Sequence, residues 1–339
     1  MTDKVYSIPS PIIDEKEERS LAELTDRYTR LLEPNLLGKM GKAVGGIIPE
    51  GLKVVGKATV DSIADAKLYQ EAMKVIAEGF SMLESQAAKF SISESAILQK
   101  VNGVVVDNEI TEVTEICLAR GYELSRLVNA YKIQDQLWAL GEGGVTGVFG
   151  FAGLPFNLVL STFLFYRAVQ SVAMFYGYDV KNDPSEMVIA SEVFVSALGP
   201  TRGGSTEMSS LIAKIMLISE LTTVKQAAKK TWEKMAVQGG IGLVLTQIRA
   251  LANSAAAKAL EKAGRKGLEN SLFSGVFRQI GKGLTKKAIS KSIPYFSAVL
   301  GACFDTVQMK RILEYADVFY NKRFLVEKEV RVHSLIQAD

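Results

Sequence analysis

Residues 143–166 read GGVTGVFGFAGLPFNLVLSTFLFY, a stretch without a single charged side chain. A transmembrane helix needs about 20 consecutive apolar residues, so this stretch raises the question of membrane contact. It begins among glycines, which weaken a helix, and Pro155 would remove a backbone hydrogen bond from a helix that ran through it. The sequence therefore supports a crossing helix only weakly.

The glycine spacing favours a different interpretation of the same stretch. Glycines occupy every third position from Gly141 to Gly153, and Gly143 is an additional one. On an α-helix this three-residue series would spiral around the surface instead of lining one face. Glycine also permits tight turns and the close approach of two backbones. We therefore expect a helical hairpin buried in the core; a segment that lies on or dips into a bilayer, and a segment that crosses it, are the alternatives. The residues expected to form this apolar element are Gly144, Gly147, Gly150, Gly153, Leu154, Pro155 and Phe156.

The rest of the chain is patterned for helices. In residues 14–33, for example, Leu21, Leu24 and Tyr28 recur at helical spacing, and Pro34 ends the pattern. The best candidate for a strand, 104–106, is too short and stands alone. The sequence predicts an all-α fold, a large multi-helix bundle of long amphipathic helices around the glycine-rich apolar hairpin. The expected helices span 14–33, 52–90, a short one capped by Ser91 or Ser93 and ending at 100, 109–140, 184–198, 205–235, 243–263, 268–280 and 294–329, with a turn at Gly239, Gly240 and Gly242 and a basic turn at 286–290.

Length and composition indicate a folded protein, either one large domain or two interlocked helical layers. The chain has 339 residues, of which 48% are hydrophobic and 23% charged, and this is ordinary usage for a folded protein. We expect a flexible N-terminal arm at 1–13, a single all-α domain at 14–330 and a C-terminal tail at 331–339.

Cysteine content and the N-terminal sequence bear on the compartment. The two cysteines, Cys117 and Cys303, both lie in apolar helical patterns, so a disulfide framework is not expected. The first 20 residues lack the apolar core of a secretory signal. A cytoplasmic protein at the inner face of the cell membrane is the resulting prediction, with secretion without a signal peptide as the alternative.

Positive charge is concentrated in one part of the chain. Residues 225–291 contain fourteen Lys or Arg against three acidic residues, so the remainder carries a net charge of −8 although the whole chain carries +3. Clustered cations are attracted to anionic headgroups by about 1 kcal/mol each, and a solvated helix face is the alternative interpretation. Nucleic acid is not expected as a partner, because aromatic interleaving and a recognition motif are missing. The residues expected to contact an anionic surface are Lys225, Lys229, Lys230, Lys258, Lys262, Arg265, Lys266, Lys286, Lys287 and Lys291.

Residues suited to catalysis or metal binding are few. The chain has one histidine, His333, which argues against catalytic triads and zinc sites built on several histidines. Glu112 and Glu115 could share a helix face, but a solvated acidic face is the simpler interpretation. Arg202 and Ser205 precede an expected helix and form a possible anion site, although ordinary capping explains them more simply. We predict no catalytic residue, no metal site and no cofactor.

The chain also carries two sets of residues that resemble a known family. The first set is Gly144, Gly147, Gly150, Gly153-Leu154-Pro155 and Tyr176-Gly177-Tyr178-Asp179. The second set is Ile293-Pro294, Gly301, Arg311, Ala316 and Tyr320-Asn321-Lys322-Arg323-Phe324. Together they resemble the EcsC family over residues 52–324, with Gly153 standing where members often have an acidic residue.

The resemblance implies a bacterial, largely helical and membrane-associated protein of a family named for an ABC-exporter operon, with no agreed activity or catalytic residues. We therefore expect a non-enzymatic protein that binds an anionic membrane face or a membrane-embedded, transporter-type partner. A membrane-active effector secreted without a leader is the first alternative. A lipid-directed enzyme with a carboxylate or hydroxyl mechanism is the second.

Overall fold

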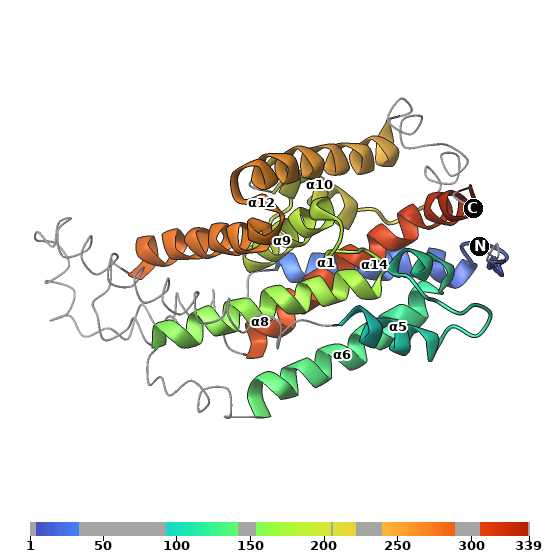
Figure 1. Ribbon diagram of the computed structural model, residues 1–339, viewed down its shortest axis with the longest axis horizontal. Coiled ribbons are helices and arrows are strands. Elements are labelled where there is room, and N and C mark those ends of the chain that lie inside the picture. Colours follow the sequence, from blue (N-terminus) through green and yellow to red (C-terminus); the bar gives the residue numbers. More distant parts are fainter. Residues whose placement is uncertain are drawn as a thin grey trace, which may run out of the picture.

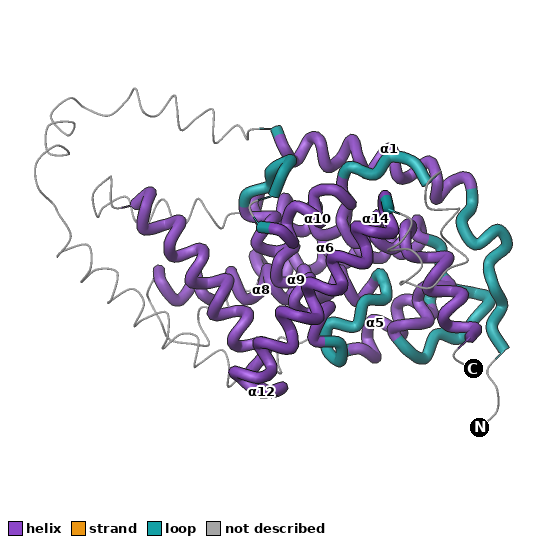
Figure 2. Tube along the Cα trace, turned by 90° about the horizontal axis from the view of Figure 1, so that it is seen from above, coloured by secondary structure: helices purple, strands orange, loops and turns teal. Residues whose placement is uncertain are grey.

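The structure is a computed structural model that describes residues 5–33, 93–141, 154–204, 206–221, 239–288 and 306–337. Every regular element in these ranges is a helix, and loops join them (Figure 2). The all-α prediction is confirmed. The elements are α1 (Glu15–Leu32), α5 (Glu94–Asn102), the 3-10 helix η2 (Val113–Leu118), α6 (Gly121–Gly141), α8 (Leu154–Phe175), α9 (Pro184–Leu198), α10 (Glu207–Met216), α12 (Gly240–Ala288) and α14 (Thr306–Gln337).

Helix α14 lies at the centre of the bundle. It packs against α1, α6, α8, α9, α10 and η2, with α9, α10 and α12 on one side and α5 and α6 on the other (Figure 1). Every residue from Tyr315 to Lys328 is buried. A helix enclosed on all sides has no face to leave in water, so its charged residues must find partners inside the protein.

Local capping signals set several of the predicted helices. The Asp14 side chain accepts a hydrogen bond from the Glu17 amide at 2.8 Å, and the Glu17 carboxylate accepts one from the Asp14 amide at 3.2 Å, which forms a capping box. Asp183 caps α9 and Pro184 fills its first position, as predicted for 184–198. Of the two candidate caps for the short helix, Ser93 caps α5.

The predicted helix 109–140 is wrong in its first third. Residues Val113–Leu118 form η2, Ala119 is extended with ψ of 164°, and α6 begins only at Gly121. The amide of Gly121 donates to Glu17 Oε1 at 2.8 Å, and this carboxylate lies 104 residues earlier in the sequence. A tertiary contact therefore fixes the start of α6.

The predicted helix 205–235 is also shorter than expected. Helix α10 ends at Met216, and its cap is Thr206, whose hydroxyl accepts from the Ser209 amide at 3.0 Å. Residues 217–221 are not helical. After these, 222–238 lie outside the described residues. The predicted turn is confirmed at Gly239 and Gly240, which have φ of 70° and 64°.

Helix α12 combines three predicted pieces. Gly264, with φ of 67° and ψ of 171°, interrupts it between the predicted helices 243–263 and 268–280, and Figure 1 shows two separate rods. Beyond this break the helix continues through residue 280 to Ala288, so the expected gap before the basic turn is absent.

The final helix extends further than predicted. Residues 331–337, expected to belong to a tail, are the last turns of α14. Val332 is fully buried and Arg331 contacts the end of α8, so these turns pack on the bundle instead of leaving it. The predicted beginning of the helix, at 294–305, lies outside the described residues.

The apolar stretch is described only in its second half. Leu154, Pro155 and Phe156 open α8, while Gly144, Gly147, Gly150 and Gly153 lie outside the described residues. The helix predicted at 52–90 and the first four residues of the predicted arm also lie outside them. The following turns are core: the Phe163 ring meets that of Phe273 at 5.6 Å and is 6% exposed. No helix in the described part of the chain is both long enough and apolar enough to span a membrane.

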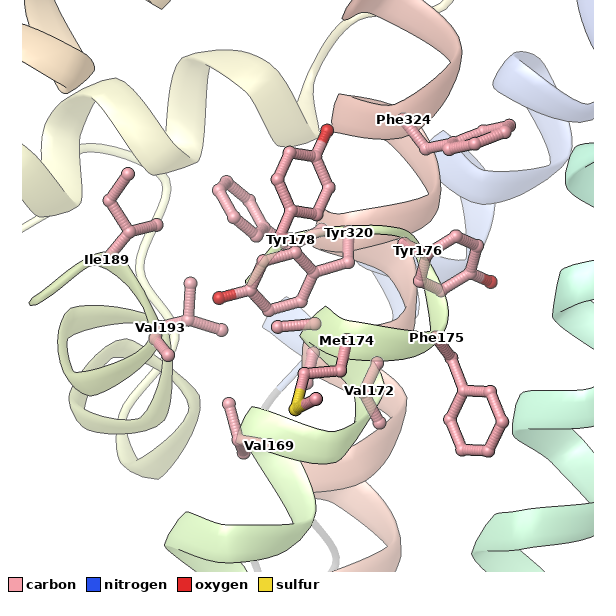
Figure 3. Close-up of a cluster of buried hydrophobic side chains, with 14 of the residues drawn as sticks. Val169, Val172, Met174, Phe175, Tyr176, Tyr178, Ile189, Val193, Tyr320 and Phe324 are labelled. Carbon is pink, nitrogen blue, oxygen red and sulfur yellow. The ribbon is translucent and has the colours of Figure 1, made fainter. Parts of the chain in front are cut away.

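Helices α8, α9 and α14 share one apolar cluster. Figure 3 shows Val169 and Val172 of α8, Ile189 and Val193 of α9 and Tyr320 of α14 meeting there. Full burial of one such side chain stabilises a fold by about 1.5 to 3 kcal/mol. This cluster holds the three helices at the distance that the ionic contacts described next require.

Candidate functional site

Five charged side chains of α14 are completely buried. They are Asp317, Lys322, Arg323, Glu327 and Lys328, each 0% exposed. Burying an unpaired charge is strongly unfavourable, so such groups need partners and hydrogen bonds within the protein. Their contacts define the most unusual chemical feature of the described chain.

Asp317 is the centre of the first cluster. Its Oδ2 accepts from Arg27 of α1 at 2.6 Å and from Lys132 of α6 at 2.7 Å, and its Oδ1 accepts from the Tyr176 hydroxyl at 2.7 Å. The same two cations also contact Glu314. One carboxylate of α14 therefore joins α1, α6 and the chain just after α8.

Glu327 is the centre of the second cluster. Its two oxygens accept from Arg323 at 3.0 Å and from the Tyr178 hydroxyl at 3.1 Å, and Arg249 of α12 lies 3.5 Å away. Arg323 also forms a bidentate pair with Glu186 in the first turn of α9, at 2.6 and 2.7 Å. Bidentate arginine pairs are among the stronger and more directional ionic contacts.

The third cluster joins Lys328 of α14 to Glu17 of α1. Its ammonium lies 2.6 Å from Glu17 Oε1, and both side chains are fully buried. Arg120 adds a contact to the other Glu17 oxygen at 3.1 Å. Since the Gly121 amide also donates to this carboxylate, Glu17 ties together α1, α6 and α14.

Cations of α14 also cap the C-terminal ends of other helices. Arg331 donates to the carbonyls of Tyr176 and Gly177 at 2.9 and 2.7 Å, just beyond the end of α8. Arg311 donates to the Leu31 carbonyl at the end of α1. Such contacts satisfy carbonyls that a helix end leaves without partners and complement the negative end of the helix dipole.

The Tyr176-Gly177-Tyr178 turn locks α8 onto α14. The two tyrosine rings diverge in Figure 3, and their hydroxyls reach the Asp317 and Glu327 clusters respectively. The Tyr178 ring also lies between two guanidinium groups, 4.1 Å from Arg323 and 4.7 Å from Arg331. The turn therefore serves the architecture of the bundle.

Asp179, the last residue of this motif, acts locally. Its Oδ1 accepts from the amides of Lys181 and Asn182 at 3.0 Å each. These bonds shape the turn that leads to the α9 cap.

The pKa values follow from burial and from these pairs. Burial alone would raise the pKa of Asp317, but Lys132 and Arg27 outweigh it and hold that pKa below its usual value. At Glu327, burial likewise raises the pKa. Arg323 and Arg249 lower it by more, so the pKa of Glu327 is also below its usual value. Burial, together with Asp317, raises the pKa of Tyr176 well above its usual value. These carboxylates are ionised and the tyrosine is neutral at pH 7.

The buried carboxylates and cations of the three clusters bind one another. Both carboxylate oxygens of Asp317, Glu327 and Glu186 accept hydrogen bonds from the protein. Within the described ranges, no group of three His, Cys, Asp or Glu side chains could hold a metal ion. The clusters suit fastening helices together better than they suit proton transfer to a substrate.

The predicted surface residues are only partly described. Lys258 and Lys262 are exposed on α12. Four more belong to α12, but their side chains are not in the described part: Arg265, Lys266, Lys286 and Lys287. The other four lie wholly outside the described residues: Lys225, Lys229, Lys230 and Lys291. Among the ten predicted cations the structure therefore describes the side chains of Lys258 and Lys262, which lie one helical turn apart.

The predicted anion site is described only in part. Arg202 is exposed, and Ser205 lies outside the described residues. At the start of α10, Thr206 donates to the Glu192 carboxylate at 2.7 Å and caps the helix. A protein carboxylate thus stands near the helix end where an anion was expected.

The predicted acidic face is wrong for one of its two members. Glu112 is exposed, but Glu115 is buried and accepts from the Tyr6 hydroxyl at 2.9 Å and the Thr111 amide at 2.6 Å. Glu115 thus anchors the N-terminal segment to η2. Sequence could not show this, because Tyr6 lies more than a hundred residues away.

Comparison with known proteins gives one result. The EcsC protein family matches residues 15–325, nearly the whole chain. The chain belongs to the EcsC family. No curated protein and no solved structure matches this EcsC chain significantly.

Some of these residues belong to the motifs that resemble the EcsC family, but the sequence did not show their roles. Tyr176, Gly177 and Arg323 stood in the motifs quoted for the EcsC resemblance, whereas Asp317 and Glu327 were not singled out. A usable signal existed, because α14 has apolar residues on every side and therefore offers its charges no solvated face.

Proposed function

We propose that this EcsC-family chain is a non-enzymatic helical protein that binds an anionic membrane face or a membrane-embedded partner, at the inner side of the cell membrane. The supporting observation is the asymmetry of α12. Lys258 and Lys262 are exposed one helical turn apart, while Ala252 and Ala256 on the same helix are buried. This helix lies in the range that carries fourteen cations against three acids.

The central charges support the non-enzymatic part of the proposal. In the described core the carboxylates with lowered pKa values are engaged by arginine, lysine and tyrosine. A catalytic acid or base commonly has its pKa shifted toward the working pH. Asp317 and Glu327 are shifted in the opposite direction.

The test is vesicle co-sedimentation with Lys258→Gln/Lys262→Gln. At about 1 kcal/mol for each cation near an anionic surface, the double variant should partition roughly 30-fold more weakly onto vesicles containing an anionic phospholipid. Binding of the unaltered protein should weaken with added salt, because screening becomes strong beyond about 8 to 10 Å.

A matched control removes the same charge elsewhere. Lys214 on α10 and Lys310 on α14 are both exposed, and Lys214→Gln/Lys310→Gln should retain most binding. Equal recovery of the unaltered protein on neutral and anionic vesicles would refute the electrostatic contribution. Release of an entrapped dye would favour the membrane-active effector.

A further inference from the structure

Lys322 differs from the other buried lysines of the central clusters. Its ammonium is fully buried and donates to the Thr25 hydroxyl and to the carbonyls of Met216 and Ile218, the last at 2.7 Å. An ammonium group has three N–H donors, so three oxygens from α1 and the end of α10 take all of them. None of these oxygens carries a full negative charge.

The other buried lysines of the clusters have carboxylate partners. Lys328 pairs with Glu17 at 2.6 Å, and Lys132 pairs with Asp317 at 2.7 Å. In the part of the chain that the structure describes, Lys322 forms no such pair. Its nearest ionisable influence is the exposed carboxylate of Asp26 on α1, and the groups that reach it from α10 are backbone carbonyls.

We propose that Lys322 is a proton-sensitive joint that fastens α14 to α1 and to the C-terminal end of α10. With the proton bound, the ammonium holds the Met216 and Ile218 carbonyls and so ends α10 at this point. A neutral amine has two N–H donors and one lone pair, so it can donate to only two of the three oxygens. This inference does not depend on membrane binding.

Two further features support a change near neutral pH. Burial lowers the pKa of Lys322 to about 7, as withdrawal from water does for cations. The Thr25 hydroxyl lies within reach of the Leu21 and Ile218 carbonyls and of Lys322. It can therefore turn and donate to the amine once the proton has left.

The test follows the lysine itself. In protein labelled with ¹⁵N-lysine, one Nζ resonance should titrate with a midpoint near pH 7 and should be missing in Lys322→Met. The amides of Leu217 and Ile218, which close the end of α10, should shift with the same midpoint in the unaltered protein.

A nearby lysine is the control. Lys214 is exposed on α10, two residues before the end of that helix. Lys214→Met should keep both titrations. If the Lys322 resonance titrates near 10.5, the ordinary lysine value, or if the two amides do not follow it, the proposal is overturned. The direct titration decides the matter even where Lys322→Met fails to fold.

Stability gives a second readout. A lysine that is neutral in the folded state but protonated when unfolded makes folding release a proton, so stability rises as pH increases from about 7 toward 10.5. Below pH 7 both states carry the proton and this dependence ends. Lys322→Met should lose the part of the rise that begins near pH 7, and a rise that still begins there would contradict the joint.

Discussion

Gly177 occupies a position where no other side chain fits without strain. Its φ is +78°, and a Cβ there would lie 2.9 Å from the Val113 carbonyl and 2.3 Å from the Arg331 guanidinium. The arginine could move, but in moving it would abandon the carbonyls at the end of α8. The backbone oxygen of Val113 cannot move so easily.

Gly177→Ala should therefore destabilise the protein by about 2 to 4 kcal/mol, because the left-handed backbone and the overpacked site both contribute. Urea unfolding measures the change. Gly203→Ala is the matched control, since a Cβ at Gly203 meets nothing within 4 Å, and it should change stability by no more than about 0.5 kcal/mol. Similar effects of both variants would refute the role given to the turn.

At the scale of elements, α14 fastens other helices by their ends. Arg323 and Lys328 reach glutamates in the first turns of α9 and α1, while Arg311, Lys322 and Arg331 reach carbonyls where α1, α10 and α8 finish. Apolar packing sets how closely the helices approach. These end contacts set their register along α14.

The two glutamate contacts should respond differently to loss of the cation. Arg323→Met leaves the buried Glu186 without its bidentate partner and should cost about 3 to 5 kcal/mol. Lys328→Met should cost less, because Glu17 keeps Arg120 and the Gly121 amide. Denaturant unfolding of both variants provides the comparison, and a larger loss in Lys328→Met would contradict this account.

Sequence predicted the elements whose signals are local. Helices α1 and α9 begin within one residue of the predicted positions, after the caps Asp14 and Asp183. The ends of α10 and the start of α6 were missed because distant groups set them, Lys322 at Met216 and Glu17 at Gly121. Of the five central charges, Lys322 and Arg323 lie in the family motifs, whereas Asp317, Glu327 and Lys328 do not, and their partners lie up to 311 residues away.

For the molecule as a whole, the buried carboxylates predict how it responds to acid. The pKa values of Glu314, Asp317 and Glu327 are below their usual values. The stability that they contribute is therefore present above the unfolded-state values, about 4, and is lost as pH falls through the lower folded-state values.

Urea midpoints measured from pH 6 to pH 2 should show this dependence. The contribution of these carboxylates should hold down to about pH 4 and then decline, because protonation leaves Arg27, Lys132 and Arg323 buried without counter-ions. Asp317→Asn should weaken the protein at pH 6 and flatten the decline. A protein most stable at pH 2 would contradict the ionic clusters.

The position of α14 in the sequence has a consequence for biosynthesis. This helix leaves the ribosome after every other described helix, yet it supplies the partners for cations and glutamates of α1, α6 and α9. A nascent chain that lacks it carries those charges beside apolar surfaces that cannot close. Such a chain must stay open, in contact with water or with a chaperone, until α14 has been synthesised.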